Sequence, residues 1–390
     1  MYSPLHRLGR IALAVLFTAG LFITPVAAFA APITPTPTSA LAQVAKTATV
    51  PDEYMRAEVT SIVSETPSPT DPSKILQIVT VHIQSGKDAG KTETIHYDLG
   101  ASEAKIPMLH SGESVVVIKI QDPDGVAYYV SDINRIPALL AFVGLFLLLA
   151  IVIGRGRGMS SVVGLGASIA ILVFAVVPAI VHGNDPRLVI LLASPFIIGI
   201  SMFLAHGFSR QTGLAVISTV LTLILAALLA GASVSIANLY GGGNEEALYV
   251  NSLLPGGIDL QGILLVGIII GAIGVLNDIT TAQTATAHEI KEAKPEIKFA
   301  ELFTRSMRVG REHIASLVNT LVLAYAGVAF PLFLLLYITH GEQPLWTVIS
   351  SQQISEEIVR TFVGSCALIL SVPISSALAT WFYTRNRHNT

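Results

Sequence analysis

Seven long apolar stretches constrain the fold of this chain more than any other feature. Each is 18 to 25 residues long and carries almost no charge, and a helix needs about 20 apolar residues to cross a bilayer. Only 13% of all residues are charged, against about 25% in a soluble domain. We therefore expect a polytopic α-helical membrane bundle over residues 137–390, with the lipid bilayer around it. The stretches are 137–154, 160–181, 188–205, 212–236, 262–285, 315–339 and 360–382.

The first 31 residues have the pattern of a secretory signal. Arg7 and Arg10 precede a short apolar run, and the small residues Ala28 and Ala30 lie before the expected cleavage point. This order is typical of a signal peptide. An uncleaved signal anchor is the alternative, and it would raise the number of spans from seven to eight. Residues 32–50, rich in Pro and Thr, are expected to form an extended linker.

Residues 51–136 change to the alternating pattern of β-strands. Five short segments alternate apolar and polar residues between turn sequences, which predicts a compact antiparallel barrel of the OB-like type. Its Lys and Arg residues are scattered and the net charge of the chain is −3, so no nucleic acid partner is expected. A lid or spacer role for this domain is the simpler alternative. The segments are 54–65, 74–84, 91–98, 114–120 and 126–133.

The distribution of Lys and Arg predicts the orientation in the membrane. With residues 32–136 outside, the connecting segments on the inner side hold eleven Lys and Arg, whereas those on the outer side hold one. Positive charge is retained on the cytoplasmic side of membrane proteins. We therefore expect an extracytoplasmic β-domain and a cytoplasmic C-terminus.

The segment 286–314 is expected to be a cytoplasmic amphipathic connector. After Pro295 its apolar residues recur every three or four positions, as on one face of a helix. Such a helix lies at the membrane interface, where its arginines could contact anionic lipid headgroups or pair with Glu289 or Glu292. A helix packed under the bundle is the alternative. The apolar face consists of Phe299, Phe303, Met307, Gly310 and Ile314.

The fifth apolar stretch, 262–285, combines glycines with an acidic residue. Gly267, Gly271, Gly274 and Asp278 are spaced by three or four residues, so they share one face of a helix. A glycine stripe allows a second helix to approach closely. We therefore predict that the three glycines are helix-packing positions and that Asp278 faces protein.

Polar residues near this stretch form the candidate intramembrane site. An ionisable residue within a span usually has a partner or a water path, yet Asp278 follows Gly262 by about 24 Å of helix and so lies towards the cytoplasmic side. A structural role and an ion- or proton-coupling role both remain open. Asn319 is at a similar depth in the next span and could meet Asp278. The candidate residues are Asn277, Asp278, Thr281, Asn319 and Tyr325.

Motifs of catalysis and cofactor binding are not found in the sequence. Cys366 is the only cysteine, so neither an internal disulfide nor a cysteine metal site is available. His288 and Glu289 lack the second histidine of a zinc-protease helix, and no phosphate loop or nucleophile elbow is present. We expect no cofactor, no metal site and no enzymatic activity.

The stretch GAIGVLNDITTAQTATAHEI at 271–290 resembles the signature helix of the YibE/F-like family of bacterial membrane proteins. The resemblance continues through RSMRVGR at 305–311, NTLVLAYAG at 319–327 and Pro331. It extends over about residues 51–385 and is most specific between Gly271 and Pro331. Asn277 departs from the family pattern, where an apolar residue is expected. The resemblance implies a multi-pass plasma-membrane protein with an extracytoplasmic β-domain, and it supplies no catalytic residues.

Two functions from different classes fit these features. The first is a transporter or permease for a small solute or ion, because polar residues surround Asp278 and prolines interrupt several spans. The second is a non-transporting envelope sensor, scaffold or assembly partner that acts through the β-domain. A homo-oligomer is compatible with either function.

Overall fold

The computed structural model describes residues 53–69, 71–99, 107–122, 125–338 and 344–385. Two compact units are distinguished, divided near residue 148, and each is described by itself. The signal segment 1–31 and the linker 32–50 lie outside the described residues.

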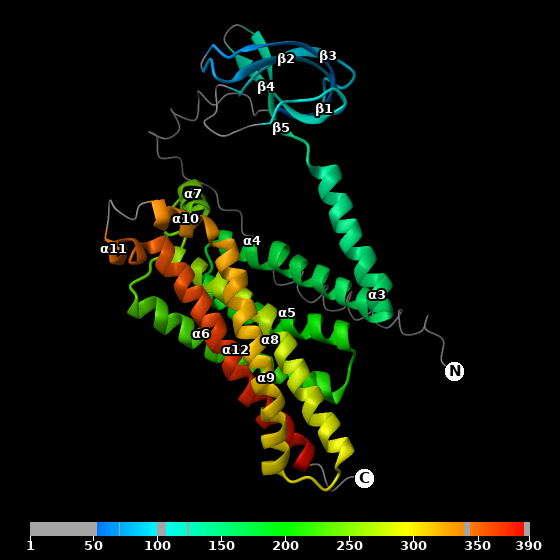
Figure 1. Cartoon of the computed structure of the whole chain (residues 1–390), viewed down its shortest axis with the longest axis vertical. Coiled ribbons are helices and arrows are strands. Elements are labelled where there is room, and N and C mark those ends of the chain that lie inside the picture. The colour runs from blue at the N-terminus through cyan, green and yellow to red at the C-terminus, as the bar shows by residue number, and fades with distance from the viewer. Residues whose placement is uncertain (1–52, 70, 100–106, 123–124, 339–343, 386–390) are drawn as a thin grey trace. The chain divides into compact units, whose positions relative to one another are not determined.

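The first unit contains a five-stranded antiparallel sheet (Figure 1). Its strand order is β3-β2-β1-β4-β5, and β3 and β5 also approach each other, so the sheet is nearly closed. All five predicted strands are confirmed within three residues at each end. The strands are β1 (Glu53–Pro67), β2 (Ile75–Ile83), β3 (Thr92–Asp98), β4 (Ser114–Asp122) and β5 (Gly125–Ile133).

Because side chains alternate along a strand, every second residue points into the interior of this sheet. In β2, for example, Val79, Val81 and Ile83 are fully buried while the residues between them are partly exposed. β1 is long enough to pair with both β2 and β4, and two register shifts opposite β2 bend it. A bulge increases the local twist of a strand, which allows a small sheet to curl round its own apolar core.

The helical unit contains the long apolar helices that make this a membrane protein. Among the residues that the structure describes, five helices are long and apolar enough to cross a bilayer, or six if one bent pair is a single span. Large apolar side chains cover the outside of several of them, as expected of surfaces that face lipid. The long helices are α3 (Ile136–Ile171), α5 (Pro186–His206), α6 (Arg210–Ile236), α8 (Leu260–Ala293), α9 (Phe299–Val328) and α12 (Gln352–Arg385), and the shorter ones are η3 (Leu172–Val176), α4 (Val177–Val181), α7 (Glu245–Leu253), α10 (Phe330–Ile338) and α11 (Leu345–Ile349).

The first long helix is broken at Arg155. The backbone there is not helical, with φ of 52°. A side chain on Gly158 would come within 1.9 Å of the carbonyl oxygen of Ala150, although eight residues of straight helix span about 12 Å. The chain therefore turns back sharply after residue 154, where the sequence predicted the end of a span.

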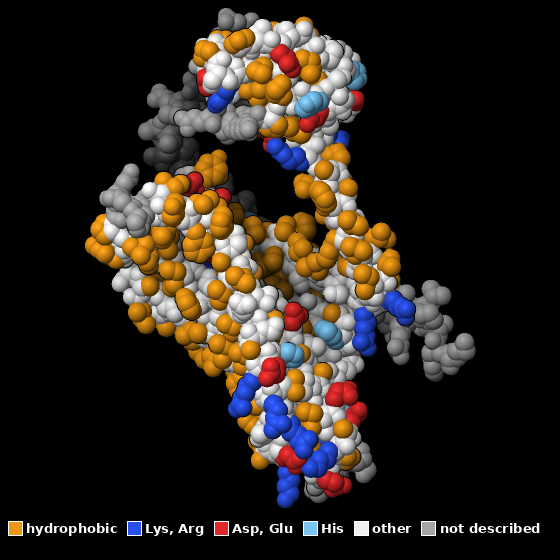
Figure 2. Space-filling view, in the orientation of Figure 1, with side chains coloured by type: hydrophobic (Ala, Val, Ile, Leu, Met, Phe, Trp, Pro, Cys, Tyr) orange, Lys and Arg blue, Asp and Glu red, His pale blue; other side chains and the backbone are white. Residues whose placement is uncertain are grey.

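The segment 286–314 is helical, but it is not a separate surface helix. Its first part completes α8, a short turn follows, and its second part begins α9, which runs without interruption into the next apolar stretch. Leu302, Ser306 and Gly310 are the buried positions, and α9 packs against α12 and α8. This arrangement fits the alternative interpretation, a helix packed under the bundle, better than a helix that lies at the membrane interface. Figure 2 shows charged side chains gathered where α8 and α9 are joined.

The apolar stretch 315–339 is bent near Pro331. The position of this proline in the sequence predicted an interruption there. α9 stops at Val328 and α10 continues at an angle of 63°. Pro195 and Pro373 lie inside continuous helices, so only some of the prolines break a span.

The centre of the helical unit is α8. It packs against α5, α6, α9 and α12 (Figure 1). Apolar side chains of α5, α6 and the first half of α8 form the largest core cluster, which includes Ile198, Leu223 and Ile269. The second half of α8 is different, because its buried positions are largely polar.

Candidate functional site

The face of α8 that carries Asp278 is not the buried one. Gly267, Gly274 and Asp278 are exposed in the chain, and the prediction that Asp278 faces protein is therefore wrong within a single chain. The neighbouring helices pack against the other side, where Leu276, Thr280 and Gln283 are buried. Both sides of α8 carry small or polar residues at helical spacing, so the periodicity alone did not identify the buried side.

The glycine stripe likewise does not pack against a second helix along its length. A side chain at Gly267 or Gly274 would meet no atom within 4 Å, so these two are not helix-packing positions within the chain. Gly271 is the exception, because a Cβ there would lie 2.7 Å from the hydroxyl oxygen of Tyr325. The stripe borders an open space instead of a neighbouring backbone.

A polar seam runs through the bundle on the buried side of α8. We use this name for seven side chains that are wholly buried although each carries a hydroxyl or amide group. They come from four helices, of which only α8 and α9 are consecutive in sequence. The residues are Thr219 of α6, Thr280, Gln283 and Thr284 of α8, Ser306 of α9, and Ser376 and Thr380 of α12.

The link between α6 and α8 is a direct contact of two hydroxyls. The Oγ1 atoms of Thr219 and Thr280 are 2.6 Å apart. Each hydroxyl also contacts a carbonyl oxygen of its own helix, at Ala215 and Leu276 respectively. A threonine hydroxyl has one proton to donate and can accept as well, so this pair has more acceptors than protons.

Gln283 joins α8 to α12 and lies near α9. The hydroxyl of Ser376 donates to Oε1 of Gln283 over 2.9 Å, and the side-chain nitrogen lies 3.4 Å from Nδ1 of His313. A side chain at Gly310 would come within 3.1 Å of the Gln283 amide and 2.3 Å of Val372. Gly310 thus leaves the space in which an amide group is held among three helices.

Several oxygens along or beside the seam have no hydrogen-bond partner within the described part of the chain. Ser306 Oγ and Thr380 Oγ1 belong to the seam, and Asn277 Oδ1 and Thr281 Oγ1 lie next to it on α8. An unpaired buried hydroxyl costs about 1–3 kcal/mol. Oxygens left open in this way are able to bind water, a polar solute or a cation.

A cavity of about 690 Å³ lies beyond the seam, near the first half of α8. Apolar residues of η3, α4, α7 and α8 form most of its wall. Gly267 and Gly271 line it, which explains why the glycine face of α8 is open. The polar lining groups come from Asn244, Glu246, Tyr325, Glu356 and Arg360.

An apolar layer separates the cavity from the seam. Ile279, Leu368 and Val372 are fully buried, and Leu321 packs against them. Gly271 and Thr280 are nine residues apart, which is about 13 Å of helix. The two polar regions therefore lie at different levels along α8, with this apolar cluster between those levels.

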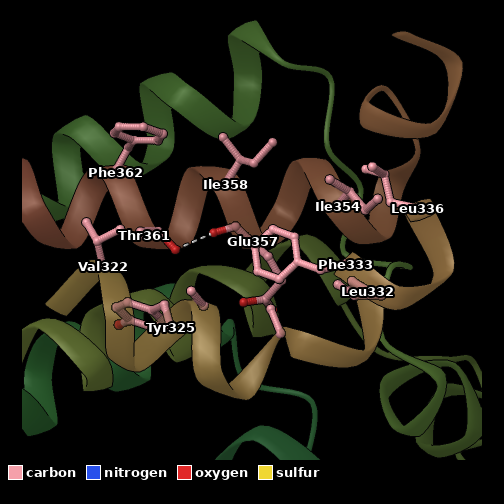
Figure 3. A pocket seen from close by; sticks show the side chains of 12 residues that line it. Val322, Tyr325, Leu332, Phe333, Leu336, Ile354, Glu357, Ile358, Thr361 and Phe362 are labelled. Atoms are coloured by element: carbon pink, nitrogen blue, oxygen red, sulfur yellow. Dashed lines mark hydrogen bonds between the residues drawn. The ribbon is translucent and has the colours of Figure 1, made fainter. Parts of the chain in front are cut away.

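Tyr325 lies on the cavity side of this layer. It also borders a smaller pocket of about 190 Å³ between α9, α10 and α12, shown in Figure 3. Glu357 faces that pocket and pairs with Arg360 over 2.6 Å. Within α12 the hydroxyl of Thr361 donates to the carbonyl oxygen of Glu357, the dashed line in Figure 3.

The predicted site residues are not brought together as a set. Asn277 and Thr281 lie beside the seam, and Tyr325 lies at the cavity. Asn319 is exposed on α9, and no hydrogen bond joins it to Asp278 among the described contacts. Sequence reasoning missed Thr280, Gln283 and Thr284 as a buried group, although their spacing, followed by Ala287, is that of one helix face. In α12 the hydroxyl residues Ser371, Ser375, Ser376 and Thr380 also recur at helical spacing, which indicates a second polar helix face.

The β-domain has a polar centre of its own at Asp88. Its carboxylate, only 5% exposed, accepts hydrogen bonds from Lys119, from Lys91 over 2.5 Å and from Tyr128 over 3.1 Å. The two ammonium groups hold the pKa of Asp88 well below its ordinary value of 3.8. A groove of about 600 Å³ adjoins this network and is lined from β3, β4 and β5, including Glu93, His96 and Tyr129.

One comparison with known proteins gives a match. A family model described as YibE/F-like protein matches residues 142–385, which is more than half of the chain and includes the seam and the cavity. No curated protein and no solved structure matches the chain.

Proposed function

The chain belongs to the YibE/F-like protein family, and we propose that it is a permease that carries a small solute or ion across the bacterial plasma membrane. The observation that supports this function is the polar seam, a set of seven wholly buried hydroxyl and amide side chains on four helices, in which Thr219 contacts Thr280 and Ser376 bonds to Gln283. Polar groups inside a membrane bundle are costly and mark substrate or ion paths.

The membrane arrangement that accompanies this function has seven spans. In this arrangement residues 136–181 form two spans and the bent pair α9 and α10 forms one, which the non-helical backbone at Arg155 and the 63° bend support. The excess of Lys and Arg places the joined ends of α8 and α9 in the cytoplasm, with Arg308 and Arg311 near anionic lipid headgroups. The cavity then opens towards the outer side and the seam lies towards the inner side.

The route in this proposal passes from the cavity through the apolar layer to the seam. In this proposal the apolar cluster with Leu321, Leu368 and Val372 is the barrier on the route. Movement of α9 against α8 and α12 would connect the two polar regions. The chemistry needs no bound cofactor and no catalytic residue, and we propose that the protein is not an enzyme.

Flux through proteoliposomes tests this function. Thr219→Val removes the hydroxyl that contacts Thr280, and Thr222→Val removes a wholly buried hydroxyl that bonds to a carbonyl of its own helix. The two substitutions on α6 have the same shape and chemistry. We expect Thr219→Val to lower flux of a transported solute and Thr222→Val to leave it unchanged.

Two further variants distinguish the sides of α8. Gln283→Leu makes the seam apolar and should abolish flux, whereas Asp278→Asn changes the exposed side. Flux lost in Asp278→Asn and kept in Gln283→Leu would move the route to the exposed side. No flux of any solute in a broad panel by the wild type would contradict the proposed function.

The groove beside Asp88 supports a second candidate, an envelope sensor or assembly partner. The strand order and the approach of β3 to β5 fit an OB-like barrel, a fold that binds ligands on its sheet face. Lys91, Lys119, His96 and Tyr129 give the groove a mixed polar and aromatic lining. A protein captured by the full-length chain and lost with Tyr129→Ala, together with absence of flux, would favour this candidate.

A further inference from the structure

Glu356 is a buried carboxylate without a cationic partner. It lies near the start of α12, is 3% exposed and lines the 690 Å³ cavity. The backbone N–H of Gly243 and the amide of Gln352 both donate to its Oε1. Within the described residues, Oε2 accepts no hydrogen bond and no Lys or Arg forms a salt bridge with Glu356.

The nearby guanidinium does not neutralise this charge. Arg360 is one turn further along α12 and pairs with Glu357 over 2.6 Å. Of the charged groups that line the cavity, Glu246 and Glu356 are acidic, and Arg360 is the basic one, with Nη1 paired to Glu357 and Nε without a partner among the described residues. A buried charge without a partner costs several kcal/mol, so a cation in the cavity would be favoured electrostatically.

The remainder of the wall selects against a small hydrated cation. Most lining residues are apolar, among them Val176, Ile180, Val250, Ile263 and Ile270. The volume lies in the range of about 300–1,000 Å³ typical of sites for drug-sized ligands. An apolar body carrying one positive charge satisfies both the wall and the carboxylate.

A loop rich in glycine covers the charged end of the cavity. A side chain at Gly243 would come within 2.7 Å of the Gln353 backbone, and one at Gly241 within 2.0 Å of the Leu260 carbonyl oxygen. The loop therefore lies directly on α8 and α12. It leads into α7, whose Asn244, Glu246 and Val250 form one wall of the cavity.

We propose that this cavity is a binding site for an amphipathic organic monocation, with Glu356 as its counter-charge. The proposal deepens the proposed function by naming the class of solute, and it rests on that function only for the step from binding to transport. Binding at equilibrium requires no flux, so the two can fail separately.

The test uses two ions of the same shape and opposite charge. Binding of tetraphenylphosphonium and of tetraphenylborate is measured on the full chain in nanodiscs, with empty nanodiscs subtracted. We expect saturable binding of the cation and none of the anion. Glu356→Gln keeps the acceptor for Gly243 and removes the charge, and we expect affinity for the cation to fall by about tenfold or more.

Two further variants separate electrostatic from structural effects. Glu245→Gln removes the same charge from α7 outside the cavity lining and should leave affinity unchanged. Gly267→Phe fills the cavity from a position with no atom within 4 Å and should abolish binding without altering the thermal transition. Equal binding of both ions, unchanged affinity in Glu356→Gln, or no saturable binding by the wild type would overturn the proposal.

Discussion

Tyr325 occupies a space that exists because residue 271 has no side chain. Its hydroxyl lies 2.7 Å from where a Cβ of residue 271 would stand, and near Gly364 of α12 on the other side. Gly271 therefore has a packing role that its neighbours Gly267 and Gly274 lack. Their spacing predicts that the three glycines share one helix face. Which of them is closely packed depends on the neighbouring helices, whose positions the spacing does not give.

Gly271→Ala should destabilise the protein by about 1 kcal/mol, the low end of overpacking costs, because the end of the Tyr325 side chain has to shift towards the cavity that it lines. Gly274→Ala is the matched control: it has free space and should be neutral or gain about 0.5–1 kcal/mol of helix stability. Thermal unfolding in detergent measures both. Combining Gly271→Ala with Tyr325→Phe should restore much of the loss. Equal transition temperatures for the two alanine variants would contradict this packing.

Asp88 makes the β-domain sensitive to acid. Because its pKa is lower in the folded state than its ordinary value of 3.8, its stabilising effect is complete above that value and is lost as the pH falls below it. Hydrogen exchange of β4 and β5 in the full chain, corrected for intrinsic rates, should show weaker protection below about pH 4. Asp88→Asn should be less protected at neutral pH and should lose this part of the pH dependence.

At the scale of elements, α9 and α12 are held together through Gly310. The helices run antiparallel, since Gly310 meets Val372 whereas Tyr325 meets Gly364. This contact places Ser306 and Thr380 at the same end of the interface. It also joins the amphipathic start of α9 to the bundle. The residue pattern alone fits both a helix packed on the bundle and a helix on the membrane surface.

Gly310→Ala should loosen the contact between α9 and α12, with a cost of about 1–3 kcal/mol from overpacking against Val372. Val372→Ala in the same chain should recover most of it, because a Cβ at residue 310 would stand 2.3 Å from Val372 Cγ1. Gly327→Ala, on the same helix with no atom within 4 Å, is the control. Additive losses in the double variant would count against direct contact.

The elements that the sequence predicts well are those with one strong periodicity. The five strands alternate clearly, and the apolar stretches are longer than the runs of about 10–14 residues typical of buried helices in soluble proteins. α7 was not predicted, because nine residues with two glutamates after three glycines resemble a loop. The buried side of α8 could not be predicted either: Thr281 and Asp278 on one side, and Thr280 and Gln283 on the other, are equally polar.

At the scale of the whole molecule, charged groups are concentrated where the protein is expected to meet water. Charged residues gather where α8 joins α9, and apolar residues cover the outer faces of the long helices. Inside the bundle, the polar seam and the charged end of the cavity are the polar regions on which the proposed route depends. The account depends on the claim that the seam is reached by water when the apolar layer opens.

Cysteine accessibility on α8 tests that claim most directly. In a Cys366→Ser background, Thr284→Cys places a thiol in the seam and Ala272→Cys places one in the apolar core, both buried in the present conformation. In proteoliposomes, a small hydrophilic methanethiosulfonate should modify residue 284 much faster than residue 272. Equal rates, or no modification at residue 284, would contradict a hydrated route through the seam.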